Sequence, residues 1–217
     1  MPILTVSRSF GAGGAEVAAH VAAVLGWTLL DNALVDTVAQ RLGIPAEAVR
    51  EREERAPSLA VRIADALAFG SPDIVAPVAD GDSAPSDERM LAVTRLVIAE
   101  ASIAGPVVLV GRGAQVLLGE RPDAVHVLCY APRAARIARV MARERLSEDA
   151  AAERVDDVNR ARERYVALNF GREWLQPEHY HVCVNTDALG IDGAARVVLA
   201  TVHERLGEIR ATPAAAS

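Results

Sequence analysis

The stretch that decides the fold is VSRSFGAGGAEVAAHVAAVLGW, residues 6–27. An apolar run leads into three glycines, Gly11, Gly13 and Gly14, and then into an alanine- and valine-rich pattern that predicts a helix over 14–25. The amide groups of such a strand-to-helix turn can converge on an anion, and the dipole of the following helix strengthens the attraction. The stretch therefore predicts a phosphate site at the start of a helix.

The glycine turn departs from the usual phosphate-loop pattern, G-x-x-x-x-G-K-[ST]. When the pattern is laid over residues 8–15, Gly13 matches its second glycine, but Gly14 stands at the lysine and Ala15 at the hydroxyl residue that binds magnesium. A second pattern, the dinucleotide fingerprint G-x-G-x-x-G, fails because Glu16 stands at its third glycine and no compact βαβ repeat follows. A tight turn without any ligand is the remaining alternative.

Composition and charge limit the partners of the chain. Its 217 residues carry a net charge of −6 at pH 7, which is unsuited to general nucleic-acid binding, so we expect a small-molecule nucleotide as the partner. No run reaches the roughly 18 apolar residues of a membrane span, so we expect no membrane contact and a cytoplasmic location. Cys129 and Cys183 lie in apolar runs and are predicted to be buried thiols. A homodimer through apolar helices remains open.

Predicted strands and helices alternate along the chain. Strands are predicted at 3–7, 27–31, 106–111, 124–131 and 180–186, and helices at 14–25, 32–43, 45–56, 58–69, 87–104, 114–119, 133–168 and 191–209. Four of the strands are nearly continuous apolar runs, which is typical of a parallel sheet covered by helices on both faces. The order predicts an α/β fold with a loop over 70–87 and a ligand site at the carboxyl ends of the strands.

Four segments of the chain resemble the cytidylate kinase-like family. They are LTVSRSFGAGGAEVAAHVAAVLGWTLLDNALV (4–35), VVLVGRGAQVLL (107–118), AVHVLCYAPRAARIARVM (124–141) and NRARERYVALNFGREWLQPEHYHVCVNT (159–186). The resemblance implies a three-layer P-loop NTPase fold with a parallel sheet, a helical monophosphate-binding insertion and an arginine-rich lid. It implies one domain with a core over 1–31, 87–132 and 179–209, the insertion over 32–86 and the lid over 133–178. We expect 210–217 to be a disordered tail.

The same resemblance implies a function. Members of the family transfer the γ-phosphoryl group of ATP, with Mg²⁺, to a nucleoside monophosphate, typically CMP. Because the phosphate-loop lysine is missing, a second possibility is a catalytically impaired nucleotide-binding or regulatory protein that keeps the fold. A third is a kinase for another small phosphate or hydroxyl acceptor.

The resemblance also assigns roles to residues. The donor phosphates are expected in the turn formed by Ser9, Phe10, Gly11, Ala12, Gly13, Gly14 and Ala15. The acceptor is expected at Asp31, Arg112 and Gly113, where Gly113 replaces the aspartate of a Gly-Arg-Asp pattern. Catalytic charge is expected from Arg8, Arg136, Arg160 and Arg162. The magnesium ligands are unknown, with Ser7, Glu16 and Asp31 as candidates.

Several of these residues have a plainer alternative. Arg8 either supplies the charge of the missing lysine, because its planar fork can grip phosphate oxygens, or it pairs with Glu16 or Asp31 as a structural bridge. The other arginines of the first lid helix are predicted to form a solvated face: Arg139, Arg143 and Arg145.

Two aromatic features of the last part of the chain also have alternatives. His179 and His181 flank Tyr180 at the predicted start of a strand, which would place both rings on one face. We expect packing or surface roles for them, because no third metal ligand lies nearby in the sequence. Trp174 is predicted to anchor the lid to the core rather than to stack on a base.

Overall fold

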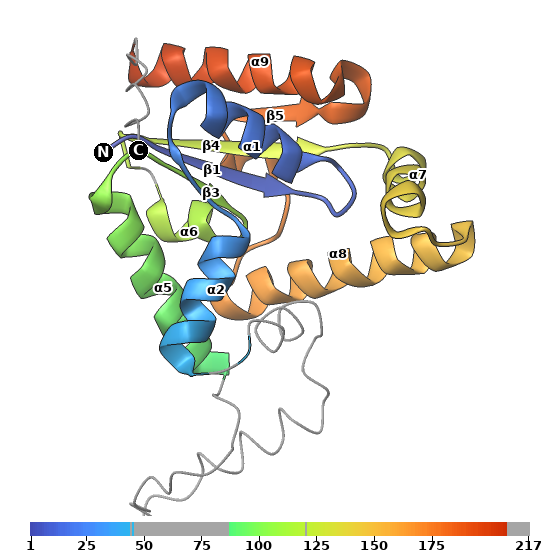
Figure 1. Cartoon of the computed structure of the whole chain (residues 1–217), viewed down its shortest axis with the longest axis horizontal. Coiled ribbons are helices and arrows are strands. Elements are labelled where there is room, and N and C mark those ends of the chain that lie inside the picture. Colours follow the sequence, from blue (N-terminus) through green and yellow to red (C-terminus); the bar gives the residue numbers. More distant parts are fainter. Residues whose placement is uncertain (44, 46–86, 120, 208–217) are drawn as a thin grey trace, which may run out of the picture.

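A computed structural model describes residues 1–43, 45, 87–119 and 121–207 of the chain. Its five strands form one parallel sheet in the order β2-β3-β1-β4-β5 (Figure 1). The strands are β1 (Ile3–Arg8), β2 (Thr28–Leu30), β3 (Val107–Val110), β4 (Ala124–Tyr130) and β5 (Val182–Asn185). The α/β class predicted from the strand pattern is confirmed. The helices predicted at 45–56 and 58–69, the loop over 70–87 except its last residue, and the tail over 210–217 lie outside the described residues.

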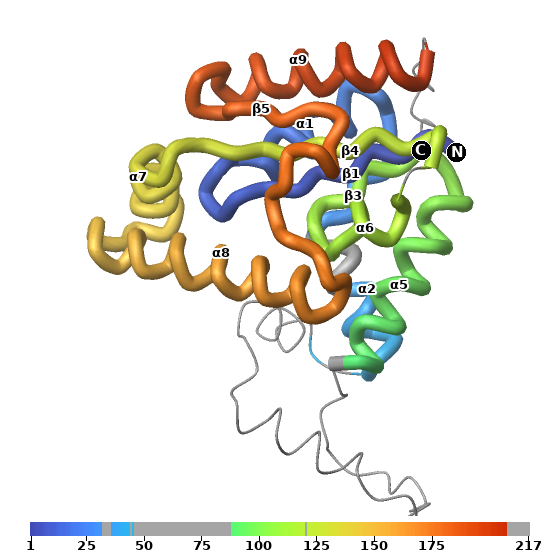
Figure 2. Tube along the Cα trace, turned by 180° about the vertical axis from the view of Figure 1, so that it is seen from behind, coloured from blue at the N-terminus to red at the C-terminus, as the bar shows by residue number. Residues whose placement is uncertain are grey.

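Helices cover both faces of this sheet and so produce three layers (Figures 1 and 2). On one face lie α1 (Gly14–Leu25) and α9 (Thr186–Leu206). On the other lie α2 (Asn32–Leu42), α5 (Asp87–Ala104) and α6 (Ala114–Leu118). Among the described helices, none has the length and apolarity needed to cross a lipid bilayer.

The central strands are apolar at successive positions because each face of the sheet has its own core. In β3, Val108 and Val110 pack under α1 and α9, whereas Val107 and Leu109 pack under α2 and α5. Side chains of a strand alternate between faces, so a strand covered on both sides must be apolar throughout. That burial explains the continuous apolar runs of the sequence.

The remaining helices, α7 (Arg133–Glu144) and α8 (Glu148–Phe170), lie beyond the carboxyl ends of the strands (Figure 1). The sequence predicted one helical region over 133–168, and this was wrong in one respect. The chain breaks at Arg145, whose φ is 56°, and the Ser147 side chain accepts a hydrogen bond from the Ala150 amide to start α8. The region predicted as a lid therefore contains two helices that share a small apolar core.

The predicted boundaries also differ at the last strand. A 3₁₀ turn, η1 (Pro177–His179), precedes β5, so that this strand begins at Val182, two residues later than predicted. The last helix begins at Thr186, earlier than predicted, because the Asn185 side chain accepts hydrogen bonds from the amides of Asp187 and Ala188. Gly190, with φ 67° and ψ 172°, interrupts that helix near the predicted start at 191.

Candidate active site

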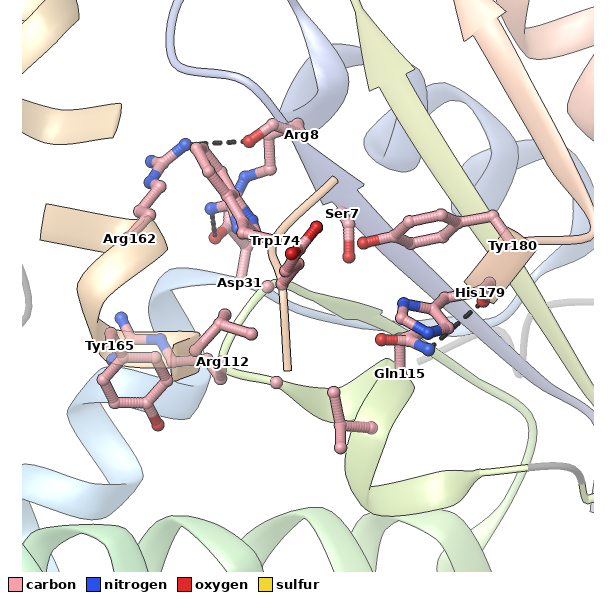
Figure 3. Close-up of a pocket in the computed structure, with 15 residues that line it drawn as sticks. Ser7, Arg8, Asp31, Arg112, Gln115, Arg162, Tyr165, Trp174, His179 and Tyr180 are labelled. Carbon is pink, nitrogen blue, oxygen red and sulfur yellow. Dashed lines mark hydrogen bonds and ion pairs between the residues drawn. The ribbon is translucent and has the colours of Figure 1, made fainter. Parts of the chain in front are cut away.

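A cavity of about 240 Å³ opens at the carboxyl ends of β1 and β3, where the parallel sheet was predicted to hold its ligand (Figure 3). Residues from the strand ends, from α6, from α8 and from the segment 173–180 surround it. They are Ser7, Arg8, Asp31, Gly111, Arg112, Gly113, Gln115, Val116, Arg162, Tyr165, Val166, Glu173, Trp174, His179 and Tyr180. All three residues predicted to contact an acceptor, Asp31, Arg112 and Gly113, are in this set.

Arg8, the last residue of β1, points across the end of β3 toward β2. Its Nη2 lies 3.4 Å from Asp31 Oδ1, and the two side chains are 20% and 25% exposed. Burial lowers the pKa of the Arg8 guanidinium, whereas the Asp31 carboxylate raises it. Of the two arrangements proposed for Arg8, the structure contains the bridge to Asp31, and this bridge borders the cavity (Figure 3).

The turn after β3 carries three consecutive residues with left-handed backbone: Gly111, Arg112 and Gly113, with φ of 77°, 61° and 67°. A Cβ at Gly111 would overlap Arg8 Nη1, and a Cβ at Gly113 would overlap the Phe170 ring. The family's aspartate therefore has no room at position 113. Arg112 adopts a conformation that costs a non-glycine residue about 1–2 kcal/mol, and such strain gathers at ligand sites.

The predicted catalytic arginines separate into two groups. Arg162, on α8, borders the cavity and donates from Nη1 to the Arg8 carbonyl at 3.1 Å. Arg136 instead donates to the carbonyls of Ala131 and Phe10, at 3.0 and 3.4 Å, and does not line the cavity. Arg160 pairs with Asp157 on the exposed face of α8 and does not line it either. The cavity thus brings together Arg8, Arg112 and Arg162.

The glycine turn before α1 lies beside this cavity, and none of Ser9–Ala15 lines it. The Phe10 amide donates to Asn159 Oδ1 of α8 at 2.9 Å, and the Ala12 amide donates to the Ser9 carbonyl at 3.1 Å. The Ser9 amide donates to the Cys129 carbonyl at 3.1 Å, so the protein's own groups occupy three of the seven amides that were predicted to hold phosphate. Among the described residues, the four remaining amides of the turn donate to no acceptor: Gly11, Gly13, Gly14 and Ala15.

Close packing explains why this turn is rich in glycine. A Cβ at Gly11 would lie 2.8 Å from the Arg136 carbonyl oxygen, and one at Gly13 would lie 2.5 Å from Ile191 Cδ1. A Cβ at Gly14 would lie 2.6 Å from Arg8 Cβ. Real Cβ atoms do not approach other heavy atoms that closely, so a lysine cannot occupy position 14 without moving α1 away from β1. The packing of α1 on β1 therefore leaves no space for the usual lysine at this position.

The side of the cavity away from the arginines is polar and aromatic (Figure 3). Gln115 Nε2 donates to the His179 carbonyl at 3.2 Å. Burial raises the pKa of Tyr180, and the hydrogen bond of its side chain with Ser7 lowers it. Trp174 also lines this cavity, and its predicted role as an anchor between lid and core stays a prediction. No motif or spacing identified Gln115 or Tyr180 as site residues in advance.

The two histidines near η1 do not share a face, which corrects the prediction. His179 lines the cavity, whereas His181 stacks on His126 with ring centroids 5.1 Å apart and accepts a hydrogen bond from the His126 amide at 2.8 Å. The 3₁₀ turn before β5 separates them. Within the described ranges, no group of three His, Cys, Asp or Glu side chains could hold a metal. Of the magnesium candidates, Ser7 and Asp31 line the cavity and Glu16 does not.

The prediction of two buried thiols is confirmed for Cys129 and only in part for Cys183. Cys129 is buried under α1, and burial raises the pKa of its thiol to about 12. Cys183 is only half-buried. Neither forms a disulfide.

Solved structures with the same arrangement identify the fold as that of the P-loop kinases. Shikimate kinase from Acinetobacter baumannii, in complex with shikimate, matches with a TM-score of 0.51 and 17% identity, over 95% of this chain and 93% of that one. Shikimate kinase from Bacteroides thetaiotaomicron matches with a TM-score of 0.51 and 12% identity, over 95% and 99%. An uncharacterized protein from Eubacterium ventriosum matches with a TM-score of 0.69 and 18% identity, over 94% and 100%. No curated protein matches.

Within that fold class the chain belongs to the cytidylate kinase-like family, whose sequence profile matches residues 3–188. The match includes β1 to β5, the glycine turn, α7 and α8. It confirms the resemblance that the four sequence segments indicated.

Proposed function

We propose that the protein is a nucleotide kinase that transfers the γ-phosphoryl group of ATP to a nucleoside monophosphate, with CMP as the first candidate. The observation that carries the proposal is the meeting of Arg8, Arg112 and Arg162 at one cavity beside the glycine turn. Guanidinium groups hold phosphate oxygens through paired, charge-assisted hydrogen bonds, so three of them suit a phosphorylated acceptor. Family membership supports the same class of reaction.

The proposed roles follow from where each group lies. Arg112 and Arg162 bind the acceptor phosphate, and Arg8, held by Asp31, adds positive charge near the reacting groups. An oxygen of the acceptor phosphate attacks the γ-phosphorus of ATP, and the bond from that phosphorus to the ADP oxygen breaks. The protein contributes mainly position and positive charge to such a transfer.

The donor nucleotide is proposed at the start of α1. The amides of Gly11, Gly13, Gly14 and Ala15 and the dipole of the twelve-residue helix α1 suit its phosphates. Mg²⁺, when bound, neutralises phosphate charge. Ser7 and Asp31 offer the hydroxyl and carboxylate oxygens that Mg²⁺ prefers, although Ser7 bonds to Tyr180 and Asp31 pairs with Arg8.

We further propose that the protein acts on free nucleotides in the cytoplasm, without a nucleic-acid or membrane partner. Its acidic net charge supports the first part of this proposal. The division into core, insertion over 32–86 and lid over 133–178 also stays a proposal, as does a homodimer.

Two observations favour a second candidate, a nucleotide-binding protein without turnover. Asn159 occupies the Phe10 amide, and position 14 has no room for a lysine. A protein with this turn can retain nucleotide affinity and lose the charge that speeds transfer.

Calorimetric titration with ATP and Mg²⁺, with CMP, and with both together, followed by a coupled assay for ADP, tests the proposal. A panel with other nucleoside monophosphates and small hydroxyl acceptors identifies the acceptor. Arg112→Gln is expected to weaken acceptor binding at least tenfold, because it removes a charged hydrogen-bond donor. Arg164→Gln, on an exposed turn of α8, is the matched control. Binding without ADP formation would support the second candidate, and an absence of binding by any acceptor would contradict the proposal.

A further inference from the structure

Phe10 belongs to the glycine turn, yet its side chain is part of the lid. The residue is 9% exposed, and it packs with Ile137 and Val140 of α7 and with Val155 and Val158 of α8. A phenylalanine in a phosphate-binding turn contributes nothing to that turn through its ring. The position of the ring therefore indicates that Phe10 acts on α7 and α8.

Three guanidinium groups surround this ring. Their central carbons lie 5.0 Å (Arg143), 5.6 Å (Arg154) and 5.5 Å (Arg162) from the ring centroid. Cations are attracted to the negative face of an aromatic ring within about 6 Å, whereas the cations repel one another. The Glu144 carboxylate lies 2.6 Å from Arg143 and 3.6 Å from Arg154, and so balances the charge on that side.

Arg162 is the member of this group that reaches the cavity. It lines the cavity, and its Nη1 donates to the carbonyl of Arg8, the residue two positions before Phe10 (Figure 3). Asn159, three residues earlier on the same helix, accepts the Phe10 amide hydrogen bond at 2.9 Å. Residues three apart lie on one face of a helix, so Phe10 contacts the same face of α8 through both its amide and its ring.

We propose that Phe10 is a positioning residue that holds Arg162 at the acceptor cavity. Its amide fixes the register of α8 through Asn159, and its ring fixes the guanidinium of Arg162. The inference rests on the proposed function, because Arg162 is taken to bind the acceptor phosphate. It replaces the predicted role of Phe10, whose amide was expected to bind the donor.

The effect of the ring can be separated from the effect of its volume. Phe10→Leu keeps an apolar side chain in the small core but removes the aromatic face, whereas Phe10→Tyr keeps the face. Calorimetry on the full chain is expected to show a three- to tenfold higher Kd for CMP in Phe10→Leu and a nearly unchanged Kd in Phe10→Tyr. Phe10→Met serves as a second non-aromatic variant, and the melting temperature of each variant reports on folding.

A double-mutant cycle tests whether Phe10 acts through Arg162. In the Arg162→Gln background, Phe10→Leu is expected to cause no further loss of CMP affinity. An equal loss in both backgrounds would show that Phe10 acts only on general packing and would overturn the inference.

A measurement without ligand separates this inference from the proposed function. In nitrogen-15 NMR spectra of the arginine side chains, the Arg162 Nε–H signal is expected to carry a ring-current shift that Phe10→Leu removes and Phe10→Tyr keeps. If the shift is present but the parent protein binds no acceptor, the proposed function and the role of Phe10 in acceptor binding both fail, and only the contact of ring and guanidinium stands. If the shift is absent in the parent protein, the inference fails whatever the protein binds.

Discussion

The chain makes two turns of the same kind, from a strand through left-handed glycines into a helix, and the protein uses them differently. The first connects β1 to α1 and has Gly11 and Gly13 at φ of 79° and 76°. The second connects β3 to α6 and has Gly111 and Gly113 at 77° and 67°. Groups of α7, α8 and α9 enclose the first turn, whereas the second forms part of the wall of the open cavity.

The difference shows that glycine content alone does not identify the accessible site. In the first turn the glycines allow other parts of the chain to approach the backbone closely. In the second turn they allow Arg8 to pass and leave Arg112 strained at the cavity. The first turn offers amide groups and the second offers charged side chains, and we propose that they bind the donor and the acceptor of a phosphoryl group respectively.

Gly14→Lys, which restores the usual phosphate-loop lysine to the first turn, is expected to have the largest effect. Its Cβ would lie 2.6 Å from Arg8 Cβ and 3.1 Å from Cys129 Cβ, so α1 must shift. We expect a loss of about 3 kcal/mol in the free energy of unfolding, measured by urea denaturation. Ala19→Lys, at an exposed position of the same helix, is the control and is expected to change it by less than about 0.5 kcal/mol. A stable and more active Gly14→Lys variant would contradict the enclosed description of the first turn.

Asp31→Asn tests the ion pair that joins the two turns. Arg8, the last residue of β1 before the first turn, passes Gly111 of the second turn before it reaches Asp31. Without the carboxylate, a largely buried guanidinium loses its counter-ion, and we expect a loss of about 2 kcal/mol of stability. Glu163→Gln, at an exposed position of α8, is the control in the same denaturation experiment. Equal stabilities of the two variants would show that the pair contributes little.

Arg112→Gly is expected to separate stability from binding in the second turn. Glycine relieves the left-handed backbone, so the free energy of unfolding should rise by up to about 1 kcal/mol, while acceptor affinity falls at least tenfold. Arg145→Gly is the control, because Arg145 also has a left-handed φ of 56° but lies outside the cavity. That variant should gain stability and keep affinity. If calorimetry showed the same change in acceptor affinity for both variants, Arg112 would not be part of the acceptor site.

The smallest effect concerns pH and the helix that follows the second turn. His126 bonds to the Gly119 carbonyl at the end of α6 and to Thr5, and burial lowers the pKa of both His126 and His181. The unfolded chain then takes up protons below about pH 6.5 that the folded chain does not bind, so stability falls as the pH decreases from there.

Melting temperatures between pH 8 and pH 5 measure this dependence. His181→Gln is expected to reduce it, and His203→Gln, at an exposed position of α9, is expected to leave it unchanged. A melting temperature of the parent protein that does not change over this range would contradict the expectation.

Much of the fold could be predicted because it depends on local patterns. The helix over 14–25 was predicted to the residue, since an apolar period begins after Gly13 and ends at Gly26 in the left-handed conformation. The helix over 87–104 was also predicted to the residue. The break at Arg145 was not predicted, because a single arginine in a left-handed conformation gives no signal in the sequence.

The candidate site was only partly predictable. Asp31, Arg112 and Arg162 were identified, and all three line the cavity. Arg136 of α7 and Arg160 of α8 were also predicted as site residues, but their guanidinium groups bond to groups outside the cavity. The packing of a helix on the rest of the protein decides which of its faces borders a cavity. A charge-rich helix has no apolar stripe, so its buried face cannot be predicted from the sequence.

The sequence by itself determined the parallel sheet, the glycine turn and the family. Apolar runs and turn glycines are local patterns, and the order of motifs follows directly from the sequence. Only the tertiary structure decided that Arg8 pairs with Asp31, that Phe10 contacts α7 and α8 and that position 14 has no room for a side chain. These outcomes depend on distances between residues far apart in the chain. Such distances are fixed when helices pack on the sheet and not before.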